Sequence, residues 1–500
     1  MISFNNIPNT VRTPGVFTEV DNSRALTGLA ANPHKALIIG QLVDSEASVG
    51  VEELKAITND GLADGYFGPG SVLARMCNTF KQANPYTELY ALALSNDGGV
   101  KASGAIQFSI ALSATGGSVT TANEQYNLLI NGTKVYTTLT SAWSITDVNS
   151  AVQAKINANS LLPVTASTNA TSALTLIAVQ SGTLGNFIDV RENFYTGESS
   201  PTAFGDSATI TPLASGAVDP DLGDAWTIIE NEQYQYIIQP YIDADNLSSL
   251  ESELEDRFKP LEDKAGQGFV ANVAALATIT ALTNGRNSPY NCIIGAYNSP
   301  TSPEEWAASL GAVAGFNLNN DPARPLHYLK LPGVLAPPKV DQFTQTERNV
   351  LLTDGCVTWV TDSSGNVLLE RCITSYQTNA LGITDASYLD IQTLATLTEI
   401  RYQFKSRMVS RFIAPRFKLA DDTFPVQPGT NVVAPKTIKS EIVALFTELR
   451  DAGLIENLDD FITNLRVERN TTDNNRVDVL LPPDLINQFR ILATNIQFIL

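Results

Sequence analysis

The feature that most constrains this chain is an apolar, strand-like segment near each of its ends. Residues 13–20 (TPGVFTEV) run from a turn signal into alternating apolar and polar positions, and residues 489–500 (FRILATNIQFIL) stay largely apolar throughout. Segments near the ends of a domain are usually polar, and an unpaired apolar strand promotes association. We therefore expect both segments to add a strand to a sheet of a neighbouring subunit, which is typical of a polymer rather than of a self-contained enzyme.

These two segments define an N-terminal arm (residues 1–25) and a C-terminal arm (residues 485–500). Main-chain hydrogen bonds would give such arms affinity with little demand on their sequence. The side chains expected at the subunit interfaces are Val16, Phe17, Thr18 and Val20 in the first arm and Ile491, Ile496 and Phe498 in the second.

Composition places the chain among ordinary globular proteins, with 43% hydrophobic and 17% charged residues. Its 500 residues allow about two to four domains. No apolar run approaches the roughly 20 residues that cross a bilayer, and the first residues lack the regions of a secretory signal. We expect the chain to mature in the cytoplasm where it is made, and we expect it not to insert into a membrane.

The charge is acidic and unevenly distributed. The net charge of −20 opposes binding to nucleic-acid phosphates. Residues 401–500 hold 13 Lys and Arg against 12 Asp and Glu, a net +1, so residues 1–400 carry the remaining −21. The last hundred residues are therefore the part best suited to an acidic partner.

Short apolar runs alternate with helical stretches in two blocks, residues 26–104 and 216–350. Such alternation is typical of an α/β layer with a mainly parallel sheet. Ser302, Pro303 and Glu305 predict a capping box at the start of one helix, with proline at the first helical position. Strands are predicted at 35–40, 88–94, 234–241, 268–273 and 292–297, and helices at 71–83, 247–258, 276–284 and 302–316.

Residues 105–215 interrupt this layer and differ in composition, with 9 charged residues in 111 and 31 Ser and Thr. Asn131-Gly132 between two strand-like runs is a strong hairpin signal. A helix is predicted at 147–157, with strands at 174–179 and 186–190. We expect a small β-rich domain, inserted into the layer and lying at its periphery.

Residues 351–484 are predicted to form a further α/β domain after a proline-rich stretch. A long helix at 386–411 carries an apolar stripe, with Arg401 and Lys405 on one flank and Arg407 and Arg411 on the other. A second helix is expected at 438–452, and strands are expected at 461–469 and 476–481.

The cysteines do not indicate a metal site, because no C-x-x-C pair occurs and the chain has only two histidines. Cys77 and Cys292 lie in apolar runs and are expected to be small buried residues. Cys356 and Cys372 flank the turn at 361–366, and a symmetric hairpin would set them opposite each other. Free thiols are favoured over a disulfide in a reducing cytoplasm, although both remain open.

No constellation typical of catalysis is present. The chain lacks a P-loop, a G-x-G-x-x-G fingerprint and a G-x-S-x-G elbow, and the glycine-rich residues 65–70 lack a lysine. His34 and His327 each lie beside or among prolines and are expected to be structural. We expect no catalytic residue, cofactor or metal, although a cytoplasmic α/β enzyme with a concealed site is an alternative.

The order of these features resembles contractile-tail sheath proteins of bacteriophages, most of all those of Mu-like phages. Residues 13–19, 22–24 and 35–40 resemble the opening of such proteins. The long helix with its cations, residues 453–455, the strand pair and the terminal strand resemble their C-terminal domain in order.

The resemblance implies a structural subunit that forms stacked hexameric rings around a tail tube. Contraction of this sheath would drive the tube through the host envelope. It also implies baseplate and tail terminator proteins as partners, assembly in the host cytoplasm and a place in the virion. A non-contractile phage structural protein is the second alternative.

The tube-facing surface is expected in the last hundred residues. As the resemblance implies, Arg401, Lys405, Arg407 and Arg411 are candidates for contacts to an acidic tube. The alternative is that these cations cover the flanks of a packed helix or pair with nearby acids.

Overall fold

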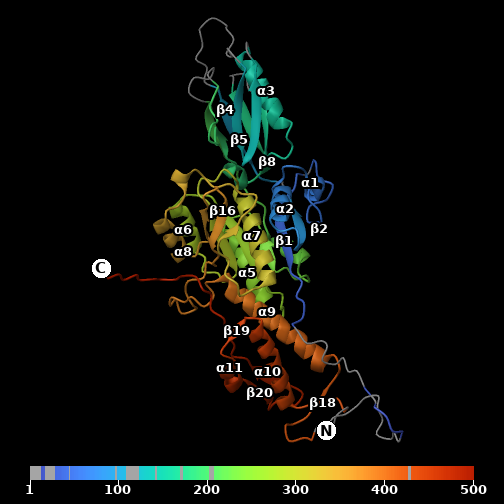
Figure 1. The fold of residues 1–500 in the computed structure, drawn as a ribbon. Helices are drawn as coiled ribbons and strands as arrows, with labels where there is room; N and C mark the ends of the chain where they lie inside the picture. Colours follow the sequence, from blue (N-terminus) through green and yellow to red (C-terminus); the bar gives the residue numbers. More distant parts are fainter. Residues whose placement is uncertain are drawn as a thin grey trace. The chain divides into compact units, whose positions relative to one another are not determined.

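The computed structural model describes most of the chain, in two compact units (Figure 1). The described residues are 13–16, 18, 29–43, 45–95, 98–108, 123–140, 143–168, 173–201, 208–425 and 430–499. The larger unit comprises residues 33–398 and 487–500, and the smaller comprises residues 1–32 and 399–486. Among the described residues, no helix combines the length and apolarity needed to cross a bilayer.

The larger unit is built on a six-stranded sheet. Its strands run in the order β13 (Asn291–Gly295), β12 (Gln267–Asn272), β11 (Tyr236–Ile238), β1 (Lys35–Gln41), β3 (Glu88–Leu94) and β2 (Leu54–Ile57). All neighbours are parallel except β2, which is an antiparallel edge strand. The central strands are buried along their length, so their apolar runs are continuous rather than alternating.

Two helices, α2 (Val72–Ala83) and α7 (Pro303–Asn320), pack on each other and on this sheet. A Cβ atom on Gly311 would come within 2.5 Å of an Ile238 side-chain carbon. Glycine at this position therefore allows α7 to approach β11 closely. The other helices of the layer are α1 (Leu62–Phe67), α4 (Gly223–Ile228), α5 (Ala244–Phe258) and α6 (Leu276–Asn284).

A small antiparallel sheet completes this layer, in the order β14 (Leu329–Lys330), β16 (Val367–Arg371) and β15 (Thr358–Thr361), beside α8 (Gln345–Thr353). A bridge between Ile294 and Val357 ties it to β13, so it belongs to the larger unit. The unit boundary lies later in the chain, within α9 (Ile391–Met408).

The hairpin of β15 and β16 is symmetric about Ser364 near its turn, as predicted, but a register shift follows between Trp359 and Thr358. Because of this bulge, Cys356 no longer opposes Cys372. The side chain of Cys356 packs with Ile279 and Leu351, whereas Cys372 belongs to the main core. All four cysteines are free and buried.

Within the larger unit, residues 101–214 share a hydrophobic core of their own, and we call them the inserted domain; this core includes Tyr126, Val148, Val152, Leu174 and Leu176. One sheet has the order β10 (Thr209–Ala214), β4 (Lys101–Gln107), β8 (Ala173–Ser181) and β7 (Val164–Thr168). The other has the order β6 (Thr133–Leu139), β5 (Glu124–Ile130) and β9 (Val190–Glu192), and α3 (Ile145–Asn157) packs against β6 and β7.

The predicted Asn-Gly hairpin is confirmed. Asn131 and Gly132 have φ of 46° and 73°, the left-handed values that this tight turn requires. The strand predicted at 186–190 is wrong in its first part, because a short 3-10 helix, Thr183–Phe187, precedes β9.

The smaller unit continues α9 into one π-helical turn, Val409–Ile413. Its other elements are β17 (Lys418–Leu419), β18 (Val432–Val433), α10 (Pro435–Asp451), β19 (Ile455–Glu456), α11 (Leu458–Asn464), β20 (Arg466–Arg469), β21 (Val477–Leu480) and β22 (Asp484–Leu485). Phe446 of α10 and Phe461 of α11 are buried and stack with ring centroids 4.0 Å apart.

The strand predicted at 461–469 is therefore only half right. Leu458, Phe461 and Leu465 recur at helical spacing, and the N–H of Phe461 donates to the carbonyl of Asn457. Packing of Phe461 on Phe446 favours the helix, and the strand begins only at Arg466.

Candidate assembly surfaces

The described residues of the N-terminal arm bury little surface against their own unit. Val16 is 96% exposed and Thr18 is also exposed, whereas Phe17 and Val20 lie outside the described residues. The segment that follows is held on α9. The N–H of Ala30 donates to Gln403 Oε1 at 2.8 Å, and Gln403 Nε2 returns a bond to the Ala30 carbonyl at 2.7 Å.

The C-terminal arm leaves its unit as a single extended trace (Figure 1). Residues 487–499 form no strand within the described chain, yet Ile491, Ile496 and Phe498 are 84%, 84% and 78% exposed. A contiguous exposed apolar segment of this kind is typical of an association site.

One ion-pair network fixes the point where this arm departs. Arg490 Nη2 lies 2.8 Å from Asp390 Oδ2, and the same carboxylate pairs with Arg371 at 3.2 Å. The sequence reasoning missed this anchor, because Asp390 and Arg490 are a hundred residues apart and unremarkable in composition.

The cations predicted to face a tube are arranged differently on the two flanks of α9. Arg407 pairs with Glu441 at 3.0 Å and with Glu448 at 2.5 Å, both on α10. Burial opposes its charged form, but these two carboxylates outweigh burial and raise the pKa of Arg407. Arg411 pairs with Glu441 at 3.4 Å. On the other flank, Arg401 is half-buried and Lys405 is exposed.

An apolar groove of about 660 Å³ lies in the smaller unit. The strand β21 forms one wall, and within the described residues β21 pairs only with β20. An apolar groove beside an unpaired strand edge is the arrangement that an added strand requires. The apolar lining residues are Phe404, Met408, Phe412, Ile413, Phe417, Leu419, Val433, Ile438, Val477 and Val479.

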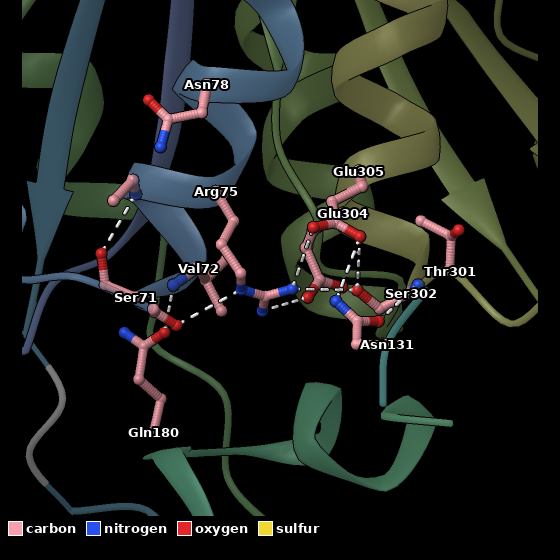
Figure 2. Close-up of polar contacts among 12 residues, drawn as sticks. Ser71, Val72, Arg75, Asn78, Asn131, Gln180, Thr301, Ser302, Glu304 and Glu305 are labelled. Carbon is pink, nitrogen blue, oxygen red and sulfur yellow. Dashed lines mark hydrogen bonds and ion pairs between the residues drawn. The ribbon is translucent and has the colours of Figure 1, made fainter. Parts of the chain in front are cut away.

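At the carboxyl edge of the six-stranded sheet, where α/β proteins usually bind ligands, the inserted domain covers the starts of two helices (Figure 2). Gln180 of β8 accepts a hydrogen bond from the N–H of Val72 at the start of α2. Asn131, in the β5–β6 turn, accepts a hydrogen bond of 2.9 Å from the N–H of Ser302 at the start of α7. Side chains of the same chain therefore occupy the helix starts where an anion would otherwise bind.

A buried charged cluster lies between these two helix starts. Arg75 of α2 donates to Glu304 at 2.5 Å, to Ser302 Oγ at 3.1 Å and to Glu305 at 3.5 Å. Asn131 Nδ2 donates to Glu305 Oε2 at 3.1 Å. We call these five residues the junction cluster.

The capping box predicted at Ser302 is wrong. The Ser302 side chain makes no capping bond to α7, because its hydroxyl accepts from Arg75 and Glu305 faces Arg75 and Asn131. The proline at the first helical position is confirmed. Sequence signals marked the helix start and the Asn-Gly turn separately, but nothing in them joined the two.

The described residues contain no cluster of three or more His, Cys, Asp or Glu side chains that could hold a metal ion. The two histidines do not come together as a site either. The ring of His34 lies against Tyr236, and burial lowers the pKa of His34 to about 4. His327 lies in the loop before β14, against Tyr328.

Comparisons with known proteins give consistent matches. The family model of the phage tail sheath protein central domain matches residues 215–375, and that of the phage tail sheath C-terminal domain matches residues 384–499. Over 501 residues, spanning both proteins completely, the chain is 38% identical to the Mu-like prophage FluMu tail sheath protein of Haemophilus influenzae.

Solved structures give weaker likenesses. The sheath tail protein from Desulfitobacterium hafniense is 12% identical, with a TM-score of 0.48 over 94% of this chain and 100% of that one. The sheath tail protein from Listeria innocua is 14% identical, with a TM-score of 0.49 over 93% of this chain and 94% of that one.

Proposed function

Because the chain belongs to the phage tail sheath protein family, a family of structural proteins rather than enzymes, we propose that it polymerises around a tail tube as a contractile sheath. Six subunits form each ring, and rings stack helically between baseplate and tail terminator proteins. Contraction then drives the tube through the host envelope. In this proposal the free energy for contraction is stored in the subunit interfaces, and whole domains re-pack as rigid bodies when it is released.

The observation that carries this proposal is the exposed apolar C-terminal arm. Burying one large apolar side chain contributes about 1.5–3 kcal/mol, and each added main-chain hydrogen bond contributes about 0.5–1.5 kcal/mol net. Ile491, Ile496 and Phe498 obtain almost none of this within their own chain. A neighbouring subunit is the partner that a sheath provides.

The acceptor in our proposal is the groove beside β21 in a neighbouring copy. A terminal arm would extend the two-stranded sheet of β20 and β21, and its apolar side chains would enter the groove. The anchors at Gln403 and Asp390 would fix where each arm leaves its own subunit. Together these contacts would link every subunit to its neighbours.

For the tube-facing surface, we propose Arg401 and Lys405 as contacts to an acidic tube, because they share one flank of α9 and Lys405 is exposed there. Arg407 and Arg411 pair with α10 carboxylates, so their contribution would be to hold α9 in position. We further propose that residues 105–215 form a peripheral domain directed away from the tube. Its low charge and insertion between two halves of the sheet layer support this placement.

Substitutions in the C-terminal arm test the polymer. Ile491→Ser, Ile496→Ser and Phe498→Ser together should leave a folded subunit that forms no tubes in negative-stain electron microscopy. Leu261→Ser is the matched control, because Leu261 is 98% exposed outside the arm and the groove. If the triple variant forms tubes as the parent chain does, the arm proposal is wrong.

Charge reversal tests the tube contact. Arg401→Glu with Lys405→Glu should impair sheath growth on tubes and leave tube-free sheath assembly intact, whereas Lys155→Glu on the exposed face of α3 should change neither. Exposed ion pairs contribute only about 0–1 kcal/mol each and weaken with salt, so the effect should shrink as salt rises. Unchanged co-assembly across a salt series would remove this flank from the tube interface.

A further inference from the structure

Hydrogen bonds, in addition to the two chain connections, attach the inserted domain to the sheet layer. Gln41 Nε2, at the end of β1, donates to the Ser181 carbonyl at 3.1 Å, and Gln180 Nε2 donates to the Leu42 carbonyl at 3.2 Å. Asp219, on the returning connection, accepts from the N–H of Thr183 at 2.7 Å. Apart from the Asp219 carboxylate these contacts are neutral, whereas the junction cluster contains three ionisable side chains, Arg75, Glu304 and Glu305.

The junction cluster has an uneven charge balance. Arg75 is the single cation, whereas Glu304 and Glu305 supply two carboxyl groups, and the side chains of Arg75 and Glu304 are 9% and 1% exposed. Glu304 Oε2 has no hydrogen-bond partner among the described residues. With both carboxyl groups ionised, the cluster would hold one negative charge that nothing in it neutralises, and burying such a charge is unfavourable.

Within the part of the chain that the structure describes, no second cationic side chain pairs with Glu304 or Glu305. The side chain of Tyr241, after β11, is buried and uncharged, and burial together with the nearby carboxylates of Asp219, Glu304 and Asp243 raises the pKa of its hydroxyl. On the inserted domain, Arg191 lies two residues after Asp189, whose carbonyl is bonded to the N–H of Asn131. Its guanidinium is bonded to the Asp189 carboxylate, at 2.5 and 2.6 Å.

The start of α7 contributes only a partial positive charge, of about half an elementary charge. A proton on one carboxyl group completes the balance, and Glu305 is less closely paired with Arg75, at 3.5 Å against 2.5 Å for Glu304.

We propose that the junction cluster is a proton-dependent latch, which holds the inserted domain on the sheet layer most firmly when Glu305 is protonated. Asn131 is the bridging residue, because its side chain is bonded to both Ser302 and Glu305 across the domain boundary. Its position is fixed by the left-handed backbone of the turn and by a bond from its N–H to the Asp189 carbonyl. When Glu305 loses its proton, the unbalanced charge favours entry of water and separation of the turn from α7.

The titration behaviour of Glu305 agrees with this geometry. Burial raises the pKa of Glu305 to about 7, with a further increase from the Glu304 carboxyl group, although the Arg75 guanidinium and the hydrogen bond from Asn131 oppose that shift. Protonation of this one side chain therefore changes across the neutral range. The consequence is that the inserted domain and the sheet layer move as one body below neutral pH and separate more often above it.

Hydrogen–deuterium exchange of the full chain tests the latch, because the Ser302 amide is bonded directly to Asn131. Asn131→Asp adds a third carboxylate beside Glu305 with almost no change in shape. We expect exchange at Ser302 to rise by about tenfold or more at pH 8 relative to the parent chain at the same pH, and by less at pH 6. Gln125→Glu, the same change at an exposed position of β5, is the matched control and should leave exchange at Ser302 unchanged.

The double variant Asn131→Asp with Glu305→Gln distinguishes a latch from a merely damaged turn. Removing the Glu305 carboxylate should restore most of the lost protection at Ser302, and Glu305→Gln alone should make that protection nearly independent of pH. Equal exchange in Asn131→Asp and the parent chain at both pH values would overturn the proposal. A loss of protection that Glu305→Gln does not reverse would overturn it as well.

Discussion

Replacing Glu305 by glutamine should remove a pH dependence from the stability of the unit that contains residues 33–398. The side chain of Glu305 is 13% exposed, and burial raises its pKa from 4.5 to about 7. Between these two pH values the folded protein keeps a proton that the unfolded chain has already released. Because the folded state then binds more protons, its stability falls as the pH rises through this window.

The magnitude follows from the same two values. A difference of one pH unit between the folded and unfolded pKa corresponds to about 1.4 kcal/mol, so Glu305 should cost about 3 kcal/mol of unfolding free energy above neutral pH. Below about pH 4.5 the side chain is neutral in both states, and the variant should be about as stable as the parent chain. Above about pH 7 the variant should be more stable, and the difference should level off.

Tryptophan fluorescence during denaturant unfolding can measure this stability difference, because it reports on the larger unit, which contains Glu305. All four tryptophans, Trp143, Trp226, Trp306 and Trp359, lie within residues 33–398. Subtracting the parent profile from that of the variant cancels the other titrating groups, and Glu255→Gln on the exposed side of α5 controls for loss of one surface carboxylate. A difference that stays flat from pH 4 to 8, or that favours the parent chain at high pH, would refute the reasoning.

Three further predictions concern the smaller unit and the arm. Phe446→Ala should destabilise the unit of residues 399–486 by about 3–5 kcal/mol, because it removes the buried ring stacked on Phe461, and faster exchange of α10 amides would show this. Arg407→Met should cost about 2 kcal/mol in the same assay, since it removes two bonds to carboxylates and keeps the apolar stem. Asp390→Asn should leave the fold intact but accelerate proteolysis after Arg490, with unchanged cleavage contradicting the anchor.

Local patterns in the sequence were sufficient for much of the sheet layer. The helix predicted at 276–284 has the bounds of α6, and the Asn-Gly turn joins β5 and β6 as expected. In both places a short stretch contains the cause of its own structure. In the first it is the helical spacing of Leu276, Ile279 and Thr283, of which Ile279 and Thr283 are buried, and in the second it is a pair of residues that tolerate left-handed backbone.

The failures have distant causes. Ser302 and Glu305 fit a capping box by spacing, but Arg75, more than two hundred residues earlier, takes the Ser302 hydroxyl. Phe461 fits a strand by composition, but its stacking partner Phe446 lies on α10. Neither partner can be identified from the local segment, because the choice depends on which elements the fold brings together.

The same distinction explains why arms could be predicted from the sequence and the junction cluster could not. An arm that binds a neighbouring subunit, as proposed, must overcome the loss of translational and rotational freedom, so it needs a large apolar area, which is visible in its composition. The inserted domain is joined covalently to the sheet layer, so its contacts face no such loss. A few ordinary polar side chains, Gln41, Asn131 and Gln180, are enough to orient it. In sheath sequences, segments that bind other subunits should therefore be recognisable by an unusually apolar composition. Contacts between domains of one subunit can be identified only in the folded structure.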